Sequence, residues 1–223
     1  MNLPRSVQAV VFDMDGLLFD TEILYGKAIL SAADELGCEM SLDLFHRFVG
    51  TPWQENRRVL LTHYGESYPA DELRAVWMEH FQALAASNLE LKPGVNELLD
   101  LLDGLALPRA IATSSSHATA KHHLAAHDLA HRFHEIVAAG DYARSKPAPD
   151  PFLEAAQRMG VDPRNCLALE DSLNGIRSAS AAGMMAVMVP DLLQPTEEIR
   201  SLCALVVGSL HDIPALLSPR RGE

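Results

Sequence analysis

Apolar runs that alternate with amphipathic stretches constrain the fold of this chain most strongly. Residues 7–13 form a β-branched apolar run, which is typical of a buried parallel strand. Five further candidate strands are residues 108–113, 135–138, 166–170, 185–189 and 204–207. Helical stretches are expected near residues 95–103, 117–127, 150–160 and 173–182. Strand–helix repetition of this kind predicts an α/β protein with a doubly wound parallel sheet.

A helical insert interrupts this alternation after the first strand. Amphipathic stretches are expected near residues 21–37, 41–48, 53–64 and 70–86, separated by glycine and proline. The insert shows no convincing strand pattern. We therefore predict two domains, a core formed by residues 1–17 and 92–223 and a small all-helical domain formed by residues 18–91.

The charge balance excludes some classes of partner. The chain has 223 residues and a formal net charge of −12. An acidic chain repels nucleic acids and anionic membranes, so we expect it to bind neither. The same charge opposes the binding of a phosphate, and a phosphate site here needs a local cation.

The cysteines and the apolar segments indicate a cytoplasmic protein. Cys38, Cys166 and Cys203 are scattered, without the spacing of a zinc site, and are expected to be reduced thiols. The apolar run that ends at Phe12 is too short for a signal peptide, and no segment approaches the length of a membrane span. We expect a monomer or a weak homo-oligomer.

Polar residues follow or end several predicted strands. Ligands of doubly wound sheets bind beyond the carboxyl ends of the strands, so these residues are candidates for a shared site. The candidates are Asp13, Asp15, Ser114, Ser115, Lys146, Glu170 and Asp171. Oxygen ligands without histidine or cysteine favour Mg²⁺. The pattern therefore predicts a site for a metal ion and an anion.

These motifs resemble those of a known family. The segment from Asp13 to Glu22, DMDGLLFDTE, is similar to the first signature of the haloacid dehalogenase-like hydrolase superfamily. Ser114, Lys146 and the pair Glu170-Asp171 match its second, third and fourth signatures. The insert lies where the branch of β-phosphoglucomutase and many sugar-phosphate phosphatases carries a helical cap. The resemblance implies a Rossmann-like core, a cap formed by residues 18–91 and a Mg²⁺ cofactor.

The resemblance also implies a role for each carboxylate. Asp13 corresponds to the nucleophile that forms an aspartyl phosphate. Asp15 corresponds to the general acid and base, and its backbone carbonyl also binds Mg²⁺ in the family. Asp171 corresponds to a direct metal ligand. Glu170 is expected to bind the metal or a metal-bound water.

The remaining candidates are expected to bind the phosphate or the substrate. Ser114 and the backbone N–H of Ser115 correspond to groups that bind phosphate oxygens. Lys146 is expected to neutralise the charge shared by the nucleophile and the phosphate. Trp53 follows Gly50, Thr51 and Pro52, a loop that faces the active site in related enzymes, and is expected to contact the substrate.

The resemblance implies a phosphatase that acts on a sugar phosphate or a related small metabolite. A phosphomutase and a non-catalytic phosphate-binding module are the alternatives. Trp53 stands where β-phosphoglucomutases have an arginine, and Tyr25 where they have a histidine, which disfavours the mutase. Asp15 disfavours a dehalogenase, which lacks this second aspartate. A phosphonatase needs a reactive cap lysine, and the only cap lysine is Lys27.

Six histidines crowd residues 117–134. His123, His127 and His131 are spaced four residues apart and can share a helix face, a pattern that can bind a transition metal. The commoner role of such a pattern is a solvated polar face, and this is what we expect here.

Overall fold

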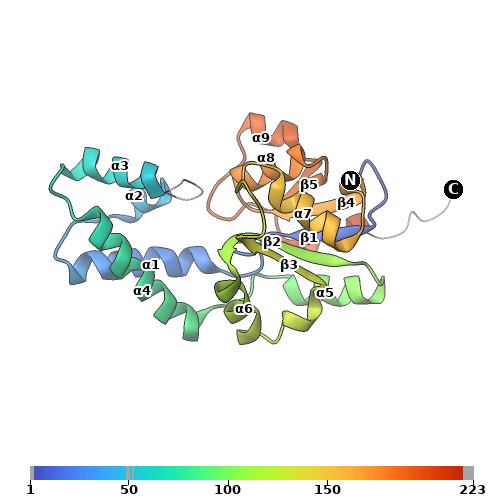
Figure 1. Cartoon of the computed structure of the whole chain (residues 1–223), viewed down its shortest axis with the longest axis horizontal. Coiled ribbons are helices and arrows are strands. Elements are labelled where there is room, and N and C mark those ends of the chain that lie inside the picture. Colours follow the sequence, from blue (N-terminus) through green and yellow to red (C-terminus); the bar gives the residue numbers. More distant parts are fainter. Residues whose placement is uncertain (1–2, 49–50, 52, 218–223) are drawn as a thin grey trace. The chain divides into compact units, whose positions relative to one another are not determined.

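The computed structural model describes residues 3–48, 51 and 53–217. The chain divides into two compact units (Figure 1). One unit comprises Met1–Phe19 together with Leu91–Glu223, and the other comprises Asp20–Glu90. No helix in the described ranges is both long and apolar enough to cross a membrane.

The first unit contains a parallel sheet in the order β3-β2-β1-β4-β5-β6. The strands are β1 (Ala9–Phe12), β2 (Arg109–Ser116), β3 (Glu135–Ala139), β4 (Cys166–Glu170), β5 (Met185–Met188) and β6 (Leu205–Val206). Each lies within or overlaps a strand expected from the apolar runs. The predicted α/β fold with a doubly wound parallel sheet is thus confirmed.

Helices cover both faces of this sheet. They are α5 (Val95–Gly104), α6 (His117–Ala126), α7 (Asp150–Met159), α8 (Leu173–Ala181), α9 (Glu197–Leu202) and α10 (Pro214–Leu217). Figure 1 shows α5 and α6 below the strands and α8 and α9 above them. Sequence periodicity missed α9 and α10, because helices this short contain too few turns to show an amphipathic repeat.

Alternating side chains of the central strand supply both layers of the core. Successive side chains of a strand point to opposite faces of the sheet. Val11 lies in one buried cluster with Phe152 of α7 and Ile176 of α8. The ring of Phe12 instead meets the ring of Phe133 edge-on, with centroids 5.7 Å apart. A strand that is apolar on both faces is therefore needed at this position.

The two chain segments that connect the units run side by side. The N–H of Lys92 donates to the carbonyl of Leu18 at 2.9 Å, and Phe19 forms an antiparallel bridge with Leu91. Gly94, which begins α5, has φ +93°, and a Cβ there would lie 2.8 Å from the backbone nitrogen of His211. A glycine is required at this position, because a Cβ atom does not fit there and other residues rarely adopt this backbone conformation.

The second unit is a helical bundle throughout its described residues. Its helices are α1 (Thr21–Glu35), α2 (Leu42–His46), α3 (Trp53–Tyr64) and α4 (Ala70–Asn88). Aromatic side chains join α1 to α4: the indole N–H of Trp77 donates to the carbonyl of Tyr25 at 2.9 Å, and the Tyr25 ring stacks on Phe81 at 3.7 Å. Tyr25 therefore contributes to the core of this bundle.

Phe152 provides a test of the core. Its side chain is fully buried between α7 and the sheet. We expect Phe152→Ala to lower the free energy of unfolding by about 3–5 kcal/mol, because the change removes apolar contacts and leaves a cavity. Leu153→Ala is the matched control, because Leu153 is 39% exposed, and it should cost less than about 1 kcal/mol. Denaturant titration of both variants measures the difference; equal losses would contradict this packing.

Candidate active site

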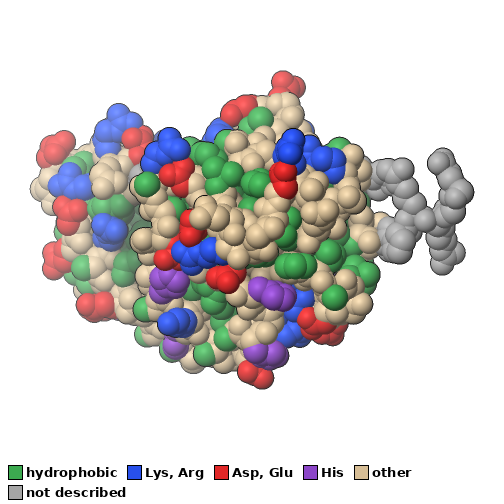
Figure 2. Space-filling view, turned by 45° about the vertical axis from the view of Figure 1, so that its right-hand side comes forward, with side chains coloured by type: hydrophobic (Ala, Val, Ile, Leu, Met, Phe, Trp, Pro, Cys, Tyr) green, Lys and Arg blue, Asp and Glu red, His purple; other side chains and the backbone are tan. Residues whose placement is uncertain are grey.

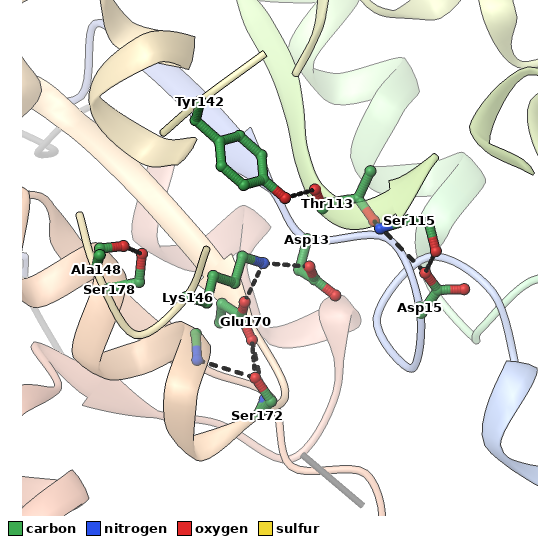
Figure 3. A network of polar contacts seen from close by, with 11 residues as sticks. Asp13, Asp15, Thr113, Ser115, Tyr142, Lys146, Ala148, Glu170, Ser172 and Ser178 are labelled. Carbon is green, nitrogen blue, oxygen red and sulfur yellow. Dashed lines mark hydrogen bonds and ion pairs between the residues drawn. The ribbon is translucent and has the colours of Figure 1, made fainter. Parts of the chain in front are cut away.

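The strand order places the candidate residues at one edge of the sheet. β1 lies between β2 and β4, and the chain winds away from β1 in both directions, which creates a topological switch point. Asp13 follows β1, Ser115 lies near the end of β2, and Glu170 ends β4. Figure 3 shows these side chains converging. The prediction that they share a site agrees with this arrangement.

The serines of the second motif lie within a strand, and not after it. We predicted the strand to end at residue 113, but β2 continues to Ser116. Its pairing with β3 shifts register between Ala112 and Ser116. Such an irregularity redirects the side chains of a strand and is common beside active sites. The sequence did not reveal this extension, because the last three residues of β2 are serines that are exposed or half-buried and show no apolar pattern.

A buried lysine lies between two buried carboxylates. Lys146 Nζ donates to Asp13 Oδ1 and lies 2.6 Å from Glu170 Oε1. The side chains of Lys146, Asp13 and Glu170 are 6%, 11% and 0% exposed. The ring of Phe152 lies 5.0 Å from the ammonium nitrogen. Buried charges are tolerated when they are paired in this way, so the three groups depend on one another.

Burial perturbs the titration of this group. Desolvation raises the pKa of Asp13 to about 8, with a further contribution from the charge of Glu170, while Lys146 opposes the rise. Burial by itself would lower the pKa of Lys146, but the two carboxylates outweigh it and raise that pKa above its usual value. Lys146 therefore stays charged at neutral pH and favours the ionised form of Asp13.

Two glycines of the motifs make room for the acidic residues. A Cβ on Gly175 would lie 1.7 Å from Glu170 Oε1, and one on Gly16 would lie 2.4 Å from Asp171 Oδ2. Gly16 also has φ +81°, a conformation that favours glycine. Sequence reasoning identified Gly16 as a turn residue and missed Gly175, whose function depends on a side chain five residues away.

Ser172 fixes the orientation of Glu170. Its backbone N–H and its hydroxyl donate to Glu170 Oε2 at 2.9 and 3.0 Å. The same hydroxyl accepts from the N–H of Gly175 and so caps α8. Glu170, Asp171 and Asp13 present carboxylate oxygens that all lie within 4.8 Å of one another. In the described part of the chain, no histidine or cysteine joins this group of potential metal ligands.

Side chains of β2 and α6 lie next to the Asp15 carboxylate. Ser115 Oγ donates to Asp15 Oδ2 at 2.8 Å, and Thr113 Oγ1 lies 3.5 Å from the same oxygen. The Ser115 N–H, which we predicted as a phosphate donor, here donates to Thr113 Oγ1 at 3.0 Å. His123 Nδ1 lies 3.9 Å from the other carboxylate oxygen. Sequence reasoning missed Thr113 and His123 as neighbours of Asp15.

The expectation of a solvated histidine face is wrong for His123. This side chain is only 2% exposed, and its ring meets Phe19 edge-on with centroids 5.6 Å apart. His127 also packs against Phe19, at 5.7 Å, whereas His131 is 64% exposed. The three histidines do not share one helix face, because α6 ends at Ala126, before His127 and His131.

Two further predicted residues lie outside this network. Ser114 is exposed on β2. Trp53 belongs to the helical unit, where it begins α3 and is half-buried, and the guanidinium of Arg74 lies 5.1 Å from its ring centroid. Gly50 and Pro52, on which the expectation for Trp53 also rests, lie outside the described residues.

Surface charges are largely mixed. Figure 2 shows lysine and arginine side chains beside aspartate and glutamate side chains on the face it draws. Exposed ion pairs include Arg144–Asp150 at 2.7 Å and Arg177–Glu198 at 2.8 Å. Such pairs neutralise one another and are screened by salt. Beside Asp13, Lys146 supplies a buried positive charge.

A doubly wound parallel sheet with buried carboxylates and a lysine at its switch point defines the class of α/β proteins whose ligands bind beyond the carboxyl ends of the strands. The haloacid dehalogenase-like hydrolase family matches residues 10–189. The chain belongs to this family.

Curated and solved relatives agree with this assignment. The chain is 36% identical to a probable pseudouridine-5'-phosphatase of Drosophila melanogaster, over 93% of this chain and 92% of that protein. It is 34% identical to hexitol phosphatase B of Escherichia coli, over 85% and 86% of the two chains. Its fold is similar to that of a putative β-phosphoglucomutase from Thermotoga maritima, with a TM-score of 0.78 and 28% identity over 93% and 96% of the chains.

The charge of Lys146 generates a pH-dependent prediction. Lys146→Met leaves Asp13 and Glu170 buried without their cation, which we expect to cost about 3–5 kcal/mol of unfolding free energy at pH 9. At pH 6 a proton on Asp13 offsets part of the lost charge, because the raised pKa of this carboxyl rises further without Lys146, and the loss should be smaller.

Denaturant titrations in EDTA at the two pH values measure this difference between variant and wild type. Lys121→Met is the control, because Lys121 is exposed on α6. A loss for Lys146→Met that is equal at pH 6 and pH 9 would contradict the charge pairing described here.

Proposed function

We propose that the protein is a Mg²⁺-dependent phosphatase that hydrolyses a small phosphorylated metabolite through a phosphorylated Asp13. The observation that carries this proposal is the contact of the buried Asp13 carboxylate with Lys146, beside the acidic pair Glu170 and Asp171. Both curated relatives described above have phosphatase names.

Asp13 is the nucleophile in this proposal. Its carboxylate oxygen attacks phosphorus, the bond from phosphorus to the leaving oxygen breaks, and an aspartyl phosphate forms on Asp13. Lys146 favours the ionised form of Asp13, and its charge stabilises the transferred group. Ser114, exposed at the same edge of the sheet, is assigned to the phosphate oxygens, together with the N–H of Ser115 once it leaves Thr113.

Asp15 transfers the protons. In the first step it donates a proton to the leaving oxygen, and in the second it accepts one from the water that attacks the aspartyl phosphate. Ser115 and Thr113 fix one of its oxygens, which limits the orientations of the carboxylate. Inorganic phosphate and the free Asp13 carboxylate are then restored.

The acidic group fits Mg²⁺. The ion prefers oxygen ligands and binds through one or two carboxylates with several waters. We assign Asp13, Asp171 and the backbone carbonyl of Asp15 as its ligands. Glu170 is already in contact with Lys146 and Ser172, so we assign it to a metal-bound water. Bound there, Mg²⁺ supplies positive charge for the phosphate oxygens.

The substrate class follows from the relatives and from the helical unit. The relatives' names refer to a nucleoside phosphate and a hexitol phosphate, both polyhydroxylated monoesters. We propose a sugar phosphate or a similar metabolite, with the unit Asp20–Glu90 as a cap and Trp53 as a substrate contact. A phosphomutase is disfavoured, because the half-buried Tyr25 ring stacks on Phe81 and Trp53 carries no charge.

We further propose that the protein works in the cytoplasm. Its three cysteines are free thiols, as expected in a reducing compartment. A monomer or weak homo-oligomer, without nucleic-acid or membrane partners, is in keeping with its acidic charge.

Replacing the nucleophile tests the mechanism. Asp13→Asn should reduce the release of phosphate from a panel of sugar and nucleoside phosphates by at least about 10³-fold, because an amide is a very poor nucleophile toward phosphorus. Its far-UV circular dichroism should match the wild type. Near-wild-type turnover by Asp13→Asn would contradict the aspartyl-phosphate mechanism.

A mutase assay separates the alternative activity. Wild-type enzyme is given Mg²⁺, β-glucose 1-phosphate and a trace of the bisphosphate. We expect free phosphate to appear faster than glucose 6-phosphate. The reverse order would identify a phosphomutase.

Metal binding should release a proton. At pH 7 the metal-free Asp13 is largely protonated, since its pKa is raised to about 8, and a bound cation favours the ionised carboxylate. We expect the release of about one proton per Mg²⁺ at pH 7 and much less above pH 9. Isothermal titration calorimetry in two buffers of different ionisation enthalpy measures this number.

Asp13→Asn is the control for that titration, because an amide has no proton to release in this range. Binding without proton release by the wild type at pH 7 would show that the cation does not bind next to a protonated Asp13.

A further inference from the structure

His123 is a buried polar residue that the proposed chemistry does not use. It lies on α6 and is 2% exposed. Its Nδ1 faces Asp15 Oδ1 at 3.9 Å. That oxygen is buried and accepts no hydrogen bond from the described part of the chain. The two atoms therefore face each other at the residue to which we assign proton transfer.

The other oxygen of Asp15 already has donors from a different element. Ser115 and Thr113 of β2 contact Oδ2, while His123 of α6 faces Oδ1. One donor leaves a carboxylate able to rotate about its hydrogen bond, whereas donors on both oxygens fix its plane. The arrangement thus contains the parts needed to orient the acid.

An imidazole can supply the missing donor. A neutral imidazole carries one N–H, which can lie on Nδ1 and point at a carboxylate. The distance of 3.9 Å is longer than a hydrogen bond, but catalytic hydrogen bonds are often long without substrate and shorten when it binds.

His123 also contacts the loop that carries Asp15. Its ring packs edge-on against Phe19. Phe19 is itself bridged to Asp15 in the loop after β1. The ring therefore packs on the same loop whose carboxylate its nitrogen faces.

We propose that His123 is a positioning residue for Asp15, whose Nδ1–H donates to Asp15 Oδ1 and orients the carboxylate for proton transfer. The inference rests on the proposed function, in which Asp15 protonates the leaving group. Loss of this contact should impair acid catalysis selectively.

Leaving-group dependence provides the readout. Phenyl phosphate and p-nitrophenyl phosphate have similar shapes, but nitrophenolate leaves without the help of an acid. The ratio kcat/KM reports only steps up to aspartyl-phosphate formation, so it isolates the first proton transfer. His123→Phe should lower kcat/KM for phenyl phosphate about tenfold more than for p-nitrophenyl phosphate.

Three further variants make the result specific. His123→Asn places a nitrogen near the Nδ1 position and should restore most of the activity on phenyl phosphate. His122→Phe alters the neighbouring exposed histidine and should behave like the wild type. Asp15→Asn should show the same selectivity as His123→Phe, with a larger loss, because general acid catalysis contributes about 10²–10⁴-fold.

The outcomes separate the two proposals. In one outcome, Asp15→Asn lowers kcat/KM for phenyl phosphate selectively, while His123→Phe lowers kcat/KM for both substrates equally, or for neither. In that case the inference about His123 fails and the role of Asp15 stands. If Asp15→Asn is not selective, the assigned acid is wrong and the inference fails with it.

A measurement on the wild type does not depend on how the variants fold. The ¹⁵N spectrum of the histidine side chains at neutral pH distinguishes a proton on Nδ1 from one on Nε2. We expect His123 to carry its proton on Nδ1. A proton on Nε2 would leave no donor toward Asp15 and would overturn the proposal.

Discussion

The site depends on the pairing of buried charges around Lys146. One ammonium group contacts Asp13 and Glu170, and all three side chains are nearly inaccessible to water. Each charge would be costly to bury alone, so the position of each depends on the other two. The structural features around the site follow from this pairing: Phe152 packs beneath the ammonium, Ser172 orients Glu170, and Gly175 makes room for its carboxylate.

The pairing also connects distant parts of the sequence. Asp13 follows β1, Lys146 precedes α7, and Glu170 ends β4, so the chain must complete most of the core before the charges can meet. In the strand order 3-2-1-4-5-6 the first strand lies in the middle, beside β2 and β4. The switch point brings Asp13 and Glu170 together, and Lys146 reaches them from the loop between β3 and α7. The helical unit interrupts the chain between Phe19 and Leu91, where the two connecting segments pair with each other.

Apolar runs and glycines were sufficient to predict the strands, the longer helices and the helical insert, because these patterns reflect local burial. The acidic motifs were likewise visible, since they directly follow or end apolar strands. Other features were not visible, because they depend on distant contacts. The extension of β2 to Ser116 carries no apolar signal, and Thr113 gains its contact with Asp15 only when β2 lies beside β1. The histidine spacing suggested one helix face, but α6 ends at Ala126, and packing against Phe19 decides that His123 is buried.

The sequence by itself determined the parallel α/β core, the position of the helical insert and the residue types at the carboxyl ends of the strands. These follow from periodicity and from the chemistry of short motifs, which act over a few residues. Only the tertiary structure decided which oxygen each donor contacts. Lys146 meets Asp13 and Glu170, Ser115 meets Asp15 through its hydroxyl, and His123 turns inward. The reason is physical: hydrogen bonds and buried charge pairs depend on separations of about 3 Å, and these are set by packing between segments far apart in the chain.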